Sequence, residues 1–209
     1  MTRRRPRAKS PVARPDRAGL ERATRLFLAA IGERSLIRDM RKTPRRVAAA
    51  WAGEILSGYA VDPARILGTA FASRDRGMVV VRDIPFVSVC VHHLLPFHGT
   101  AHVAYLPAGR IVGLSKMARL VHALARRLQL QERLTRQVAA TLDAALAPRG
   151  AACRIEAEHL CMTMRGARTR GARVVTTAYT GAFERFAVLR AEFLRLSSPS
   201  RRRGRPGGG

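Results

Sequence analysis

The sequence predicts an α+β domain built on an antiparallel sheet, because two groups of strand segments flank two long amphipathic helices. Alternating apolar residues, bounded by glycine and proline, distinguish the strand segments from the helices. The strand segments are residues 78–82, 86–91, 98–106, 111–114, 153–157 and 174–180. The change from helical to alternating periodicity near Met78 marks the point where the sheet begins.

The two long helices follow the first group of strands. Ser115 is expected to cap a helix whose apolar residues form a continuous stripe as far as Leu128. The next helix is expected from about Gln131, and Pro148 closes it.

A helical segment is expected before the sheet. Apolar residues recur at helical spacing from Leu20 to Ile31. Thr43 is expected to cap a second helix with Pro44 at its first position, and Gly58 ends that helix.

The chain has 209 residues, 47% of them hydrophobic, which is enough to bury the core of one domain. We expect this domain to span residues 18–196, with a helical segment at 18–77 and the sheet-containing core at 78–196. The flanking segments 1–17 and 197–209 are rich in arginine, proline and glycine, and are expected to be disordered basic tails.

The net charge of +25 favours anionic partners, either nucleotide phosphates or nucleic acid. Because the tails hold a large share of this charge, we expect nucleic acid to bind only nonspecifically, through them. No segment approaches the roughly 20 uninterrupted apolar residues of a membrane span, and the N-terminus lacks the apolar region of a secretory signal. We therefore expect a cytoplasmic protein without membrane contacts.

A thiol and two imidazoles lie within four residues at the end of a predicted strand, as Cys90, His92 and His93. A tight loop there would let Cys90 and His93 bind one metal ion, while His92 points away and stays free for proton transfer. His159 and Cys161 repeat the pairing at a spacing that places two strand side chains on one face.

Cys90, His93 and Cys161 together would supply three ligands, leaving a fourth position for water, as in a catalytic zinc site. Zinc held in this way lowers the pKa of its water to about 7, and His92 and His159 would be the acid/base pair. Two alternatives stay open from spacing alone: the cysteines could be buried apolar thiols or a redox pair, and the histidines could be core residues.

Two further segments suit a nucleotide. Lys116 and Arg119 follow a strand-to-helix junction, where free backbone N–H groups favour a polyphosphate. Gln131 and Glu132 would offer an amide and a carboxylate to the N1–H and amine edge of a guanine. Arg165 would bring a guanidinium near the metal. Each of these elements alone is a weak signal, because a helix-start lysine or an interhelical glutamate is usually a solvated surface group.

These segments, in this order, resemble the GTP cyclohydrolase I family. The resemblance runs from about Leu20 to Leu196 and is densest in the segments Cys90–Phe97, Gly113–Arg119, Arg126–Thr135 and His159–Gly166. It implies a tunnelling fold, in which an antiparallel sheet carries two helices on one side. Subunits of that fold join their sheets into a barrel, and the family forms decamers with active sites between subunits.

The resemblance also implies roles for individual residues. Zinc ligands are matched by Cys90, His93 and Cys161, catalytic histidines by His92 and His159, and a residue near the ribose by Ser115. Gln131 and Glu132 match the guanine anchor, and phosphate contacts are matched by Lys116, Arg119, Arg165 and Arg46. The implied reaction converts GTP to 7,8-dihydroneopterin triphosphate with release of formate, the first step of pterin and tetrahydrofolate biosynthesis.

Two positions depart from the family pattern. Val91 stands where the family has glutamate, and Ala49 stands where it has lysine. Both changes remove charge from the expected site. They leave open a divergent relative that acts on another purine or pterin, and the basic tails leave open a non-catalytic binding module.

Overall fold

The computed structural model describes residues 14–32 and 40–198. Its helical elements are α1 (Arg17–Ile31), α3 (Thr43–Ala50), the π-helical η1 (Trp51–Ile55), the 3₁₀ turn η2 (Ser57–Ala60), α4 (Pro63–Leu67), α5 (Leu114–Ala125), α6 (Gln131–Leu146), α7 (Leu160–Thr163), α8 (Ala182–Arg185) and α9 (Ala187–Ser197). Its strands are β1 (Phe71–Ala72), β2 (Val79–Cys90), β3 (Pro96–Leu106), β4 (Arg110–Ile111), β5 (Leu128–Gln129), β6 (Gly150–His159) and β7 (Val174–Tyr179). Nearly all of both basic tails lies outside the described residues.

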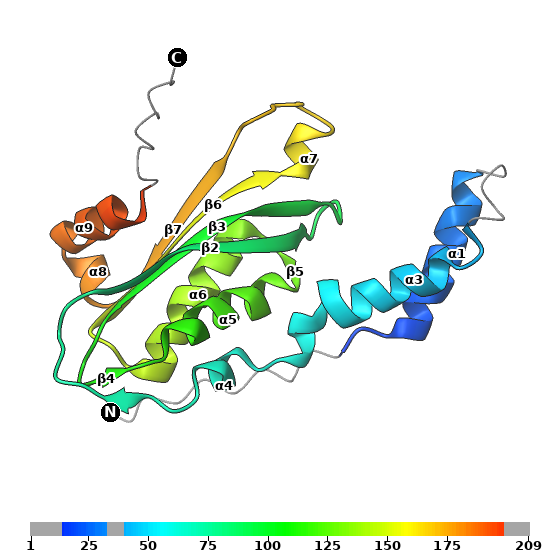
Figure 1. Ribbon diagram of the computed structural model, residues 1–209. Coiled ribbons are helices and arrows are strands. Elements are labelled where there is room, and N and C mark those ends of the chain that lie inside the picture. Colours follow the sequence, from blue (N-terminus) through cyan, green and yellow to red (C-terminus); the bar gives the residue numbers. More distant parts are fainter. Residues whose placement is uncertain (1–13, 33–39, 199–209) are drawn as a thin grey trace, which may run out of the picture.

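The main sheet has the strand order β5-β2-β3-β6-β7. The pairs β2–β3, β3–β6 and β6–β7 are antiparallel, and only the short β5 runs parallel to its neighbour. Both long helices, α5 and α6, cover one face of this sheet (Figure 1). The predicted α+β class, with an antiparallel sheet, two long helices on one side and a helical segment before it, is confirmed.

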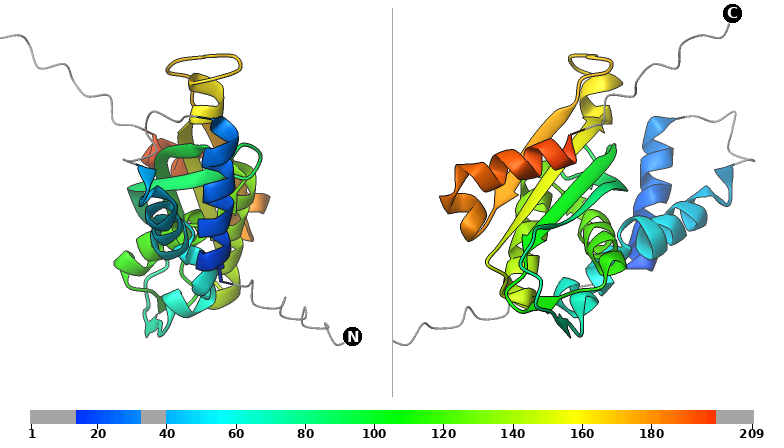
Figure 2. Two further views of the ribbon diagram at one scale, coloured as in Figure 1. Left: turned by 90° about the vertical axis from the view of Figure 1, so that its right-hand side faces the viewer. Right: turned by 60° about the vertical axis from the view of Figure 1, so that its left-hand side comes forward.

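Both faces of the sheet are covered at the end where β3 meets the first residues of β6. Val103 and Tyr105 point into the main core with the apolar faces of α5 and α6. The alternate residue Leu106 points into a second cluster, where it meets Phe183 of α8 and Phe193 of α9. Figure 2 shows α9 on the side of the sheet opposite α5 and α6. The other end of the sheet carries the site described below.

Several local predictions were wrong in detail. The helix expected to continue as far as Leu128 ends at Ala125, and Leu128 begins β5. Segments 78–82 and 86–91 belong to one strand, β2, which is interrupted by an irregularity at Asp83 with φ 57°. The backbone N–H of Asp83 donates to Nδ1 of the buried His102 there, and burial lowers the pKa of this imidazole. The helix caps are Lys42 and Gly113 rather than Thr43 and Ser115, so neither predicted hydroxyl caps its helix.

Two N-terminal helices, α1 and α3, pack together and project from the sheet as an arm (Figure 1). Apolar side chains on α1, including Leu26, Phe27 and Ile31, are more than half exposed. An amphipathic helix with its apolar stripe in solvent lacks the partner that the stripe requires. Within the described residues, no helix is long and apolar enough to cross a membrane.

Candidate active site

A tight loop between β2 and β3 brings the first two predicted ligands together. Two backbone hydrogen bonds close it: Cys90 N–H donates to Leu95 O, and Leu94 N–H donates to Cys90 O, each at 2.9 Å. Leu94 has φ 56°, a left-handed conformation that non-glycine residues seldom adopt. The chain therefore reverses within four residues, and His93 returns toward the Cys90 side chain.

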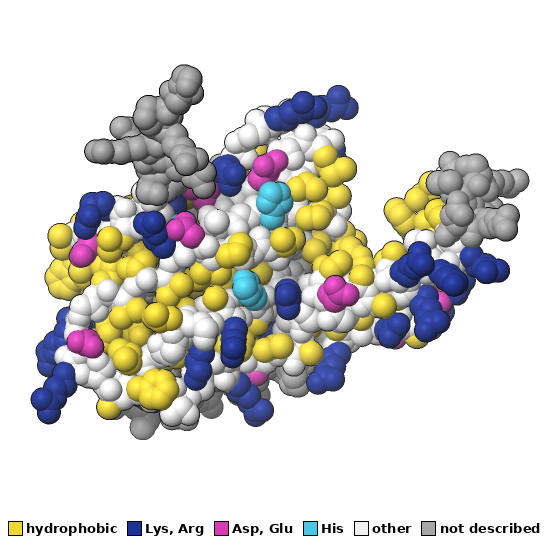
Figure 3. Space-filling view, in the orientation of Figure 1, with side chains coloured by type: hydrophobic (Ala, Val, Ile, Leu, Met, Phe, Trp, Pro, Cys, Tyr) yellow, Lys and Arg dark blue, Asp and Glu magenta, His cyan; other side chains and the backbone are white. Residues whose placement is uncertain are grey.

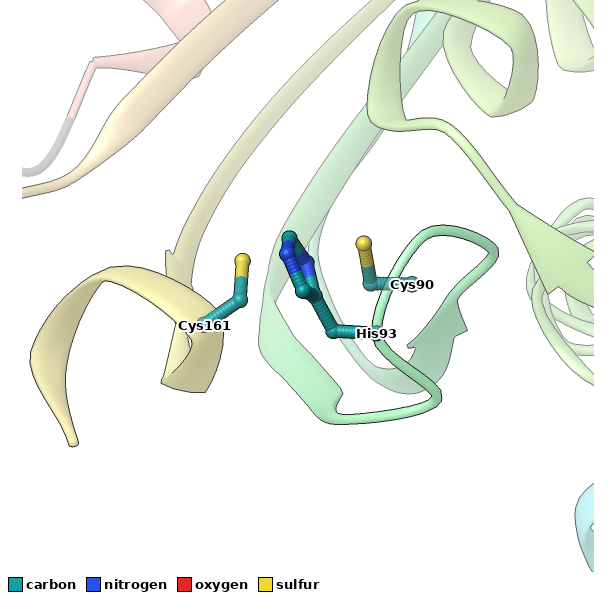
Figure 4. A group of neighbouring side chains, drawn as sticks. All are labelled: Cys90, His93 and Cys161. Atoms are coloured by element: carbon teal, nitrogen blue, oxygen red, sulfur yellow. The ribbon is translucent and has the colours of Figure 1, made fainter. Parts of the chain in front are cut away.

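The third ligand comes from α7, which follows β6. Cys161 lies in the first turn of this short helix and points toward the loop, with the His93 ring between the two sulfur atoms (Figure 4). The ligand atoms of Cys90, His93 and Cys161 all lie within 4.8 Å of one another. The structure therefore brings all three predicted metal ligands into one group.

The electrostatics of this group favour a cation. Burial raises the pKa of the Cys161 thiol, and the adjacent Cys90 sulfur raises it further, while Arg165 acts in the opposite direction. Two thiolates this close repel each other unless a positive charge lies between them. A divalent ion would supply that charge and deprotonate its coordinating thiols. Two sulfurs and one imidazole are donors that suit zinc.

The argument that joined His159 to Cys161 was wrong, although both residues are at the site. Strand β6 ends at His159 and helix α7 begins at the next residue, so the two side chains are not on one face of a strand. The His159 ring instead stacks on Phe97, with centroids 4.6 Å apart and planes 4° apart. Its Nε2 lies 2.7 Å from Oε1 of Gln131. Burial lowers the pKa of His159, and Glu132 partly opposes this effect.

Gln131 and Glu132 lie in the first turn of α6, next to the metal group, because β5 pairs Gln129 with Cys90 immediately before that helix. Their environments differ. Gln131 is buried and its amide is bonded within the chain, whereas the Glu132 carboxylate is exposed. Only Glu132 is free to meet a ligand.

Two more predicted residues border the metal group. His92 is exposed and lies outside the ligand group, with its ring edge-on to that of His93 at a centroid distance of 6.2 Å. Arg165 is exposed at the start of the loop 165–173, which holds four arginines. Figure 3 shows Lys and Arg side chains gathered over this loop. The loop that begins four residues after Cys161 is therefore strongly basic.

The remaining predicted residues are not at the metal group. The ladder between β2 and β3 pairs Val79 with Tyr105 at one end and Val89 with Pro96 at the other. Val112 N–H donates to the Tyr105 hydroxyl at 3.1 Å, which fixes the start of α5 at the first end. With a rise of about 3.3 Å per residue, that end lies about 30 Å from the metal group.

Of the predicted residues of α5, Ser115 and Lys116 in its first turn therefore lie toward the far end of the same subunit, whereas Arg119 lies one turn further along the helix, which ends beside Ser88. Ser115 and Arg119 are exposed, whereas the Lys116 ammonium donates to Leu67 O at 2.9 Å, at the end of α4. Arg46 is exposed on α3, in the projecting arm. Within one copy of the chain, the predicted metal ligands, Glu132 and Arg165 therefore lie together. The other predicted phosphate contacts lie apart from them, on α5 and on the projecting arm.

Comparison with known proteins identifies the family. A profile described as GTP cyclohydrolase I matches residues 20–198. The chain belongs to the GTP cyclohydrolase I family. GTP cyclohydrolase 1 of Geobacillus kaustophilus (strain HTA426) is 49% identical over 180 residues, which cover 86% of this chain and 95% of that protein. GTP cyclohydrolase 1 of Pelotomaculum thermopropionicum is 48% identical over 182 residues, or 87% of this chain and 96% of that protein.

A solved structure, the apo form of the archaeosine synthase QueF-Like, aligns with 52% of this chain and 97% of its own at 18% identity, with a TM-score of 0.44. This likeness is too slight to add to the assignment. The assignment to the GTP cyclohydrolase I family as an enzyme rests on the profile and the relatives.

Sequence reasoning missed the residues that support His159 at this GTP cyclohydrolase I site. Phe97 stacks on the imidazole, Thr176 accepts from the Gln131 amide that contacts it, and Thr135 bonds Thr176. Phe97 lies within a family block, but nothing in its spacing indicates contact with a histidine on another strand. The two threonines, one on α6 and one on β7, carry no sequence signal of this contact.

We predict that metal retention depends on Cys161 and not on Cys153, a fully buried thiol further along the sheet. Cys161→Ala removes one of three ligands and is expected to lower zinc retention after dialysis about 10-fold or more. Cys153→Ala is the matched control, because Cys153 is fully buried on β6 and lies outside the ligand group. Zinc per chain is measured by elemental analysis on reduced protein. Equal retention by wild type and Cys161→Ala would contradict the assignment of this ligand.

Proposed function

We propose that this enzyme converts GTP to 7,8-dihydroneopterin triphosphate and formate, with zinc held by Cys90, His93 and Cys161. One observation carries the proposal: these three side chains converge within 4.8 Å of one another beside a histidine and an exposed carboxylate. When bound, zinc would supply Lewis-acid chemistry and a water of pKa about 7. The donor set leaves a fourth position for that water.

His92 and His159 would move the protons of the reaction. Both flank the metal group, and neither belongs to the ligand set. Burial lowers the pKa of His159, which favours the neutral imidazole that can accept a proton. Exposed His92 would exchange protons with solvent and substrate. The two histidines thus suit a reaction in which proton uptake and proton donation alternate.

The Glu132 carboxylate would recognise the guanine. It is exposed in the first turn of α6, adjacent to the metal group. A carboxylate accepts two hydrogen bonds side by side, which matches the N1–H and amine donors of guanine. The base would therefore be held with its imidazole ring toward the metal.

The triphosphate would be bound by residues of a second copy. Arg119 and Lys116, with Ser115 near the ribose, lie on the first half of α5, about 9–15 Å along the helix from Ala125, whose carbonyl contacts Ser88 beside the metal loop. Exposed apolar side chains on the arm and on the sheet, such as Phe27, Val87 and Val175, are surfaces that other copies could cover. These features support a ring of subunits and the decamer of the family, with Arg46 and Arg165 as further phosphate contacts.

Val91 and Ala49 change the charge of this proposed site. Val91 is 37% exposed in the metal loop, where it contributes no carboxylate. Ala49, which stands where the family has lysine, lies on α3. Arginines of the basic loop 165–173 would supply the positive charge that this lysine provides in the family. We therefore propose retained activity toward GTP, with a relative acting on another purine or pterin as the second candidate.

The proposed reaction predicts one formate released for each GTP consumed by the zinc-loaded protein, with a pterin triphosphate that becomes fluorescent after oxidation. Removing zinc with a chelator is expected to abolish both signals, and adding zinc back to restore them. Absence of both signals from zinc-loaded wild type would reject the proposal. Turnover of a different nucleotide without turnover of GTP would favour the second candidate.

A shared site predicts that two inactive variants restore each other. Arg119→Glu damages the phosphate part and Cys161→Ala the metal part, so random mixed oligomers would regain about a quarter of the wild-type sites. Cys90→Ala mixed with Cys161→Ala is the control that stays inactive, since both changes damage the same part. Formate release is measured on differently tagged, co-purified mixtures. No recovery in verified mixed oligomers of the first pair would contradict site sharing.

A further inference from the structure

Gln131 has the most fully bonded side chain at the site. It is 2% exposed, and its amide lies where α6 packs against the paired strands β6 and β7. Its Nε2 lies 2.9 Å from Val174 O, 3.2 Å from Ile155 O and 3.1 Å from Thr176 Oγ1. Its Oε1 lies 2.7 Å from His159 Nε2.

The two strand carbonyls decide which way this amide faces. Val174 O and Ile155 O can only accept hydrogen bonds, so the atom between them must be the NH₂ group of Gln131. In the flipped orientation an amide oxygen would face two carbonyl oxygens without a proton between them. The Gln131 oxygen therefore faces His159, and His159 Nε2 must be the donor.

The two hydroxyl groups of the network are fixed by the same reasoning. Thr135 Oγ1 donates to Gln131 O at 2.7 Å, which uses its only proton. Thr176 Oγ1 lies 2.6 Å from Thr135 Oγ1, so it is Thr176 that donates in this pair. The Thr176 oxygen then accepts from Gln131 Nε2. Only one arrangement of protons gives every donor and acceptor of this network a partner.

This network leaves the other ring nitrogen of His159 free. With a proton on Nε2, the neutral imidazole carries its lone pair on Nδ1. Every fully buried side-chain nitrogen and oxygen of the described residues has a hydrogen-bond partner. Nδ1 has none among those residues, so it is not fully buried. The Phe97 ring, stacked 4.6 Å away, holds the plane in which this lone pair points.

We propose that Gln131 is a positioning residue that holds His159 as the Nε2–H tautomer, so that Nδ1 is the nitrogen that exchanges a proton in the reaction. The Nε2–H bond stays intact throughout. A proton added to the Nδ1 lone pair is returned from the same atom, and the ring passes through the imidazolium form in between. This inference rests on the proposed function.

The same geometry argues against Gln131 as a guanine anchor. Its oxygen is occupied by His159, and its two N–H protons are shared among three acceptors within the chain. A base could bind this amide only by breaking buried hydrogen bonds, at a cost of about 1–3 kcal/mol for each group left unpaired. Recognition of the base then falls to Glu132.

The test compares Gln131→Met with Gln137→Met in the zinc-loaded full chain. Gln137 lies on the same helix, accepts a hydrogen bond from Gln129 and is outside the site, so it controls for loss of a helix amide. Gln131→Met is expected to lower kcat for formate release about 10- to 100-fold, a typical effect of losing such a supporting partner. KM for GTP should stay within about 3-fold, because no ground-state contact to substrate is lost.

Two further measurements separate positioning from anchoring and from folding. Zinc content of Gln131→Met should match wild type. Preference for GTP over ITP, which lacks the exocyclic amine, should be unchanged by Gln131→Met and reduced by Glu132→Gln. A raised KM with normal kcat, or a lost preference for GTP, would assign Gln131 to the base and overturn the proposal.

A folding defect gives a distinct pattern. Loss of zinc from Gln131→Met, or an equal fall in kcat for Gln137→Met, would also overturn the positioning role.

Thr176→Val and Thr176→Ser test the same network with a smaller change. Only the serine keeps the hydroxyl that Gln131 donates to, so kcat should be closer to wild type for Thr176→Ser than for Thr176→Val. Wild-type protein that releases no formate would instead reject the proposed function.

Discussion

The register of β3 between its two neighbours is the constraint on which the site depends. Val89 of β2 faces Pro96 at one side of β3, and Phe97 faces His159 of β6 at the other. These pairings bring the ends of β2 and β6 together, although they are distant in the sequence. Since side chains alternate along a strand, a slip of one residue would turn Phe97 out of the core and away from His159.

The buried core enforces this register. Phe97 and Tyr105 are fully buried on the same face as the apolar stripes of α5 and α6. Ser88 strengthens the attachment, because its buried hydroxyl donates to Ala125 O at the end of α5 at 2.6 Å. Helix packing, strand register and site geometry are therefore parts of one arrangement. The same arrangement brings the three ligands of the metal group together.

The sequence was informative where chemistry is dense and local. Cys90 and His93 could be paired from spacing, because a short loop admits few geometries. The strand argument for His159 and Cys161 failed, because a helix begins between them and alternation cannot reveal that. Ser115 looked like a helix cap, but the helix begins earlier, at Leu114. Boundaries depend on tertiary contacts that single residues do not encode.

Gln131 and Lys116 illustrate the same limit at the level of function. Both match family positions, but the structure engages the first with His159 and the second with Leu67 O. A residue type indicates what a side chain can bond to, and packing decides which partner it meets. The proposed sharing of the site between two copies of the chain lies beyond the sequence pattern too, because it depends on how subunits pack.

The central claim is that Cys90, His93 and Cys161 bind one zinc ion. X-ray absorption at the zinc edge of the loaded, reduced protein tests it directly. The account predicts two sulfur atoms at about 2.3 Å and nitrogen or oxygen atoms at about 2.0–2.1 Å. A spectrum with only nitrogen and oxygen neighbours, or loss of sulfur scattering in the Cys153→Ala variant but not in Cys161→Ala, would contradict it.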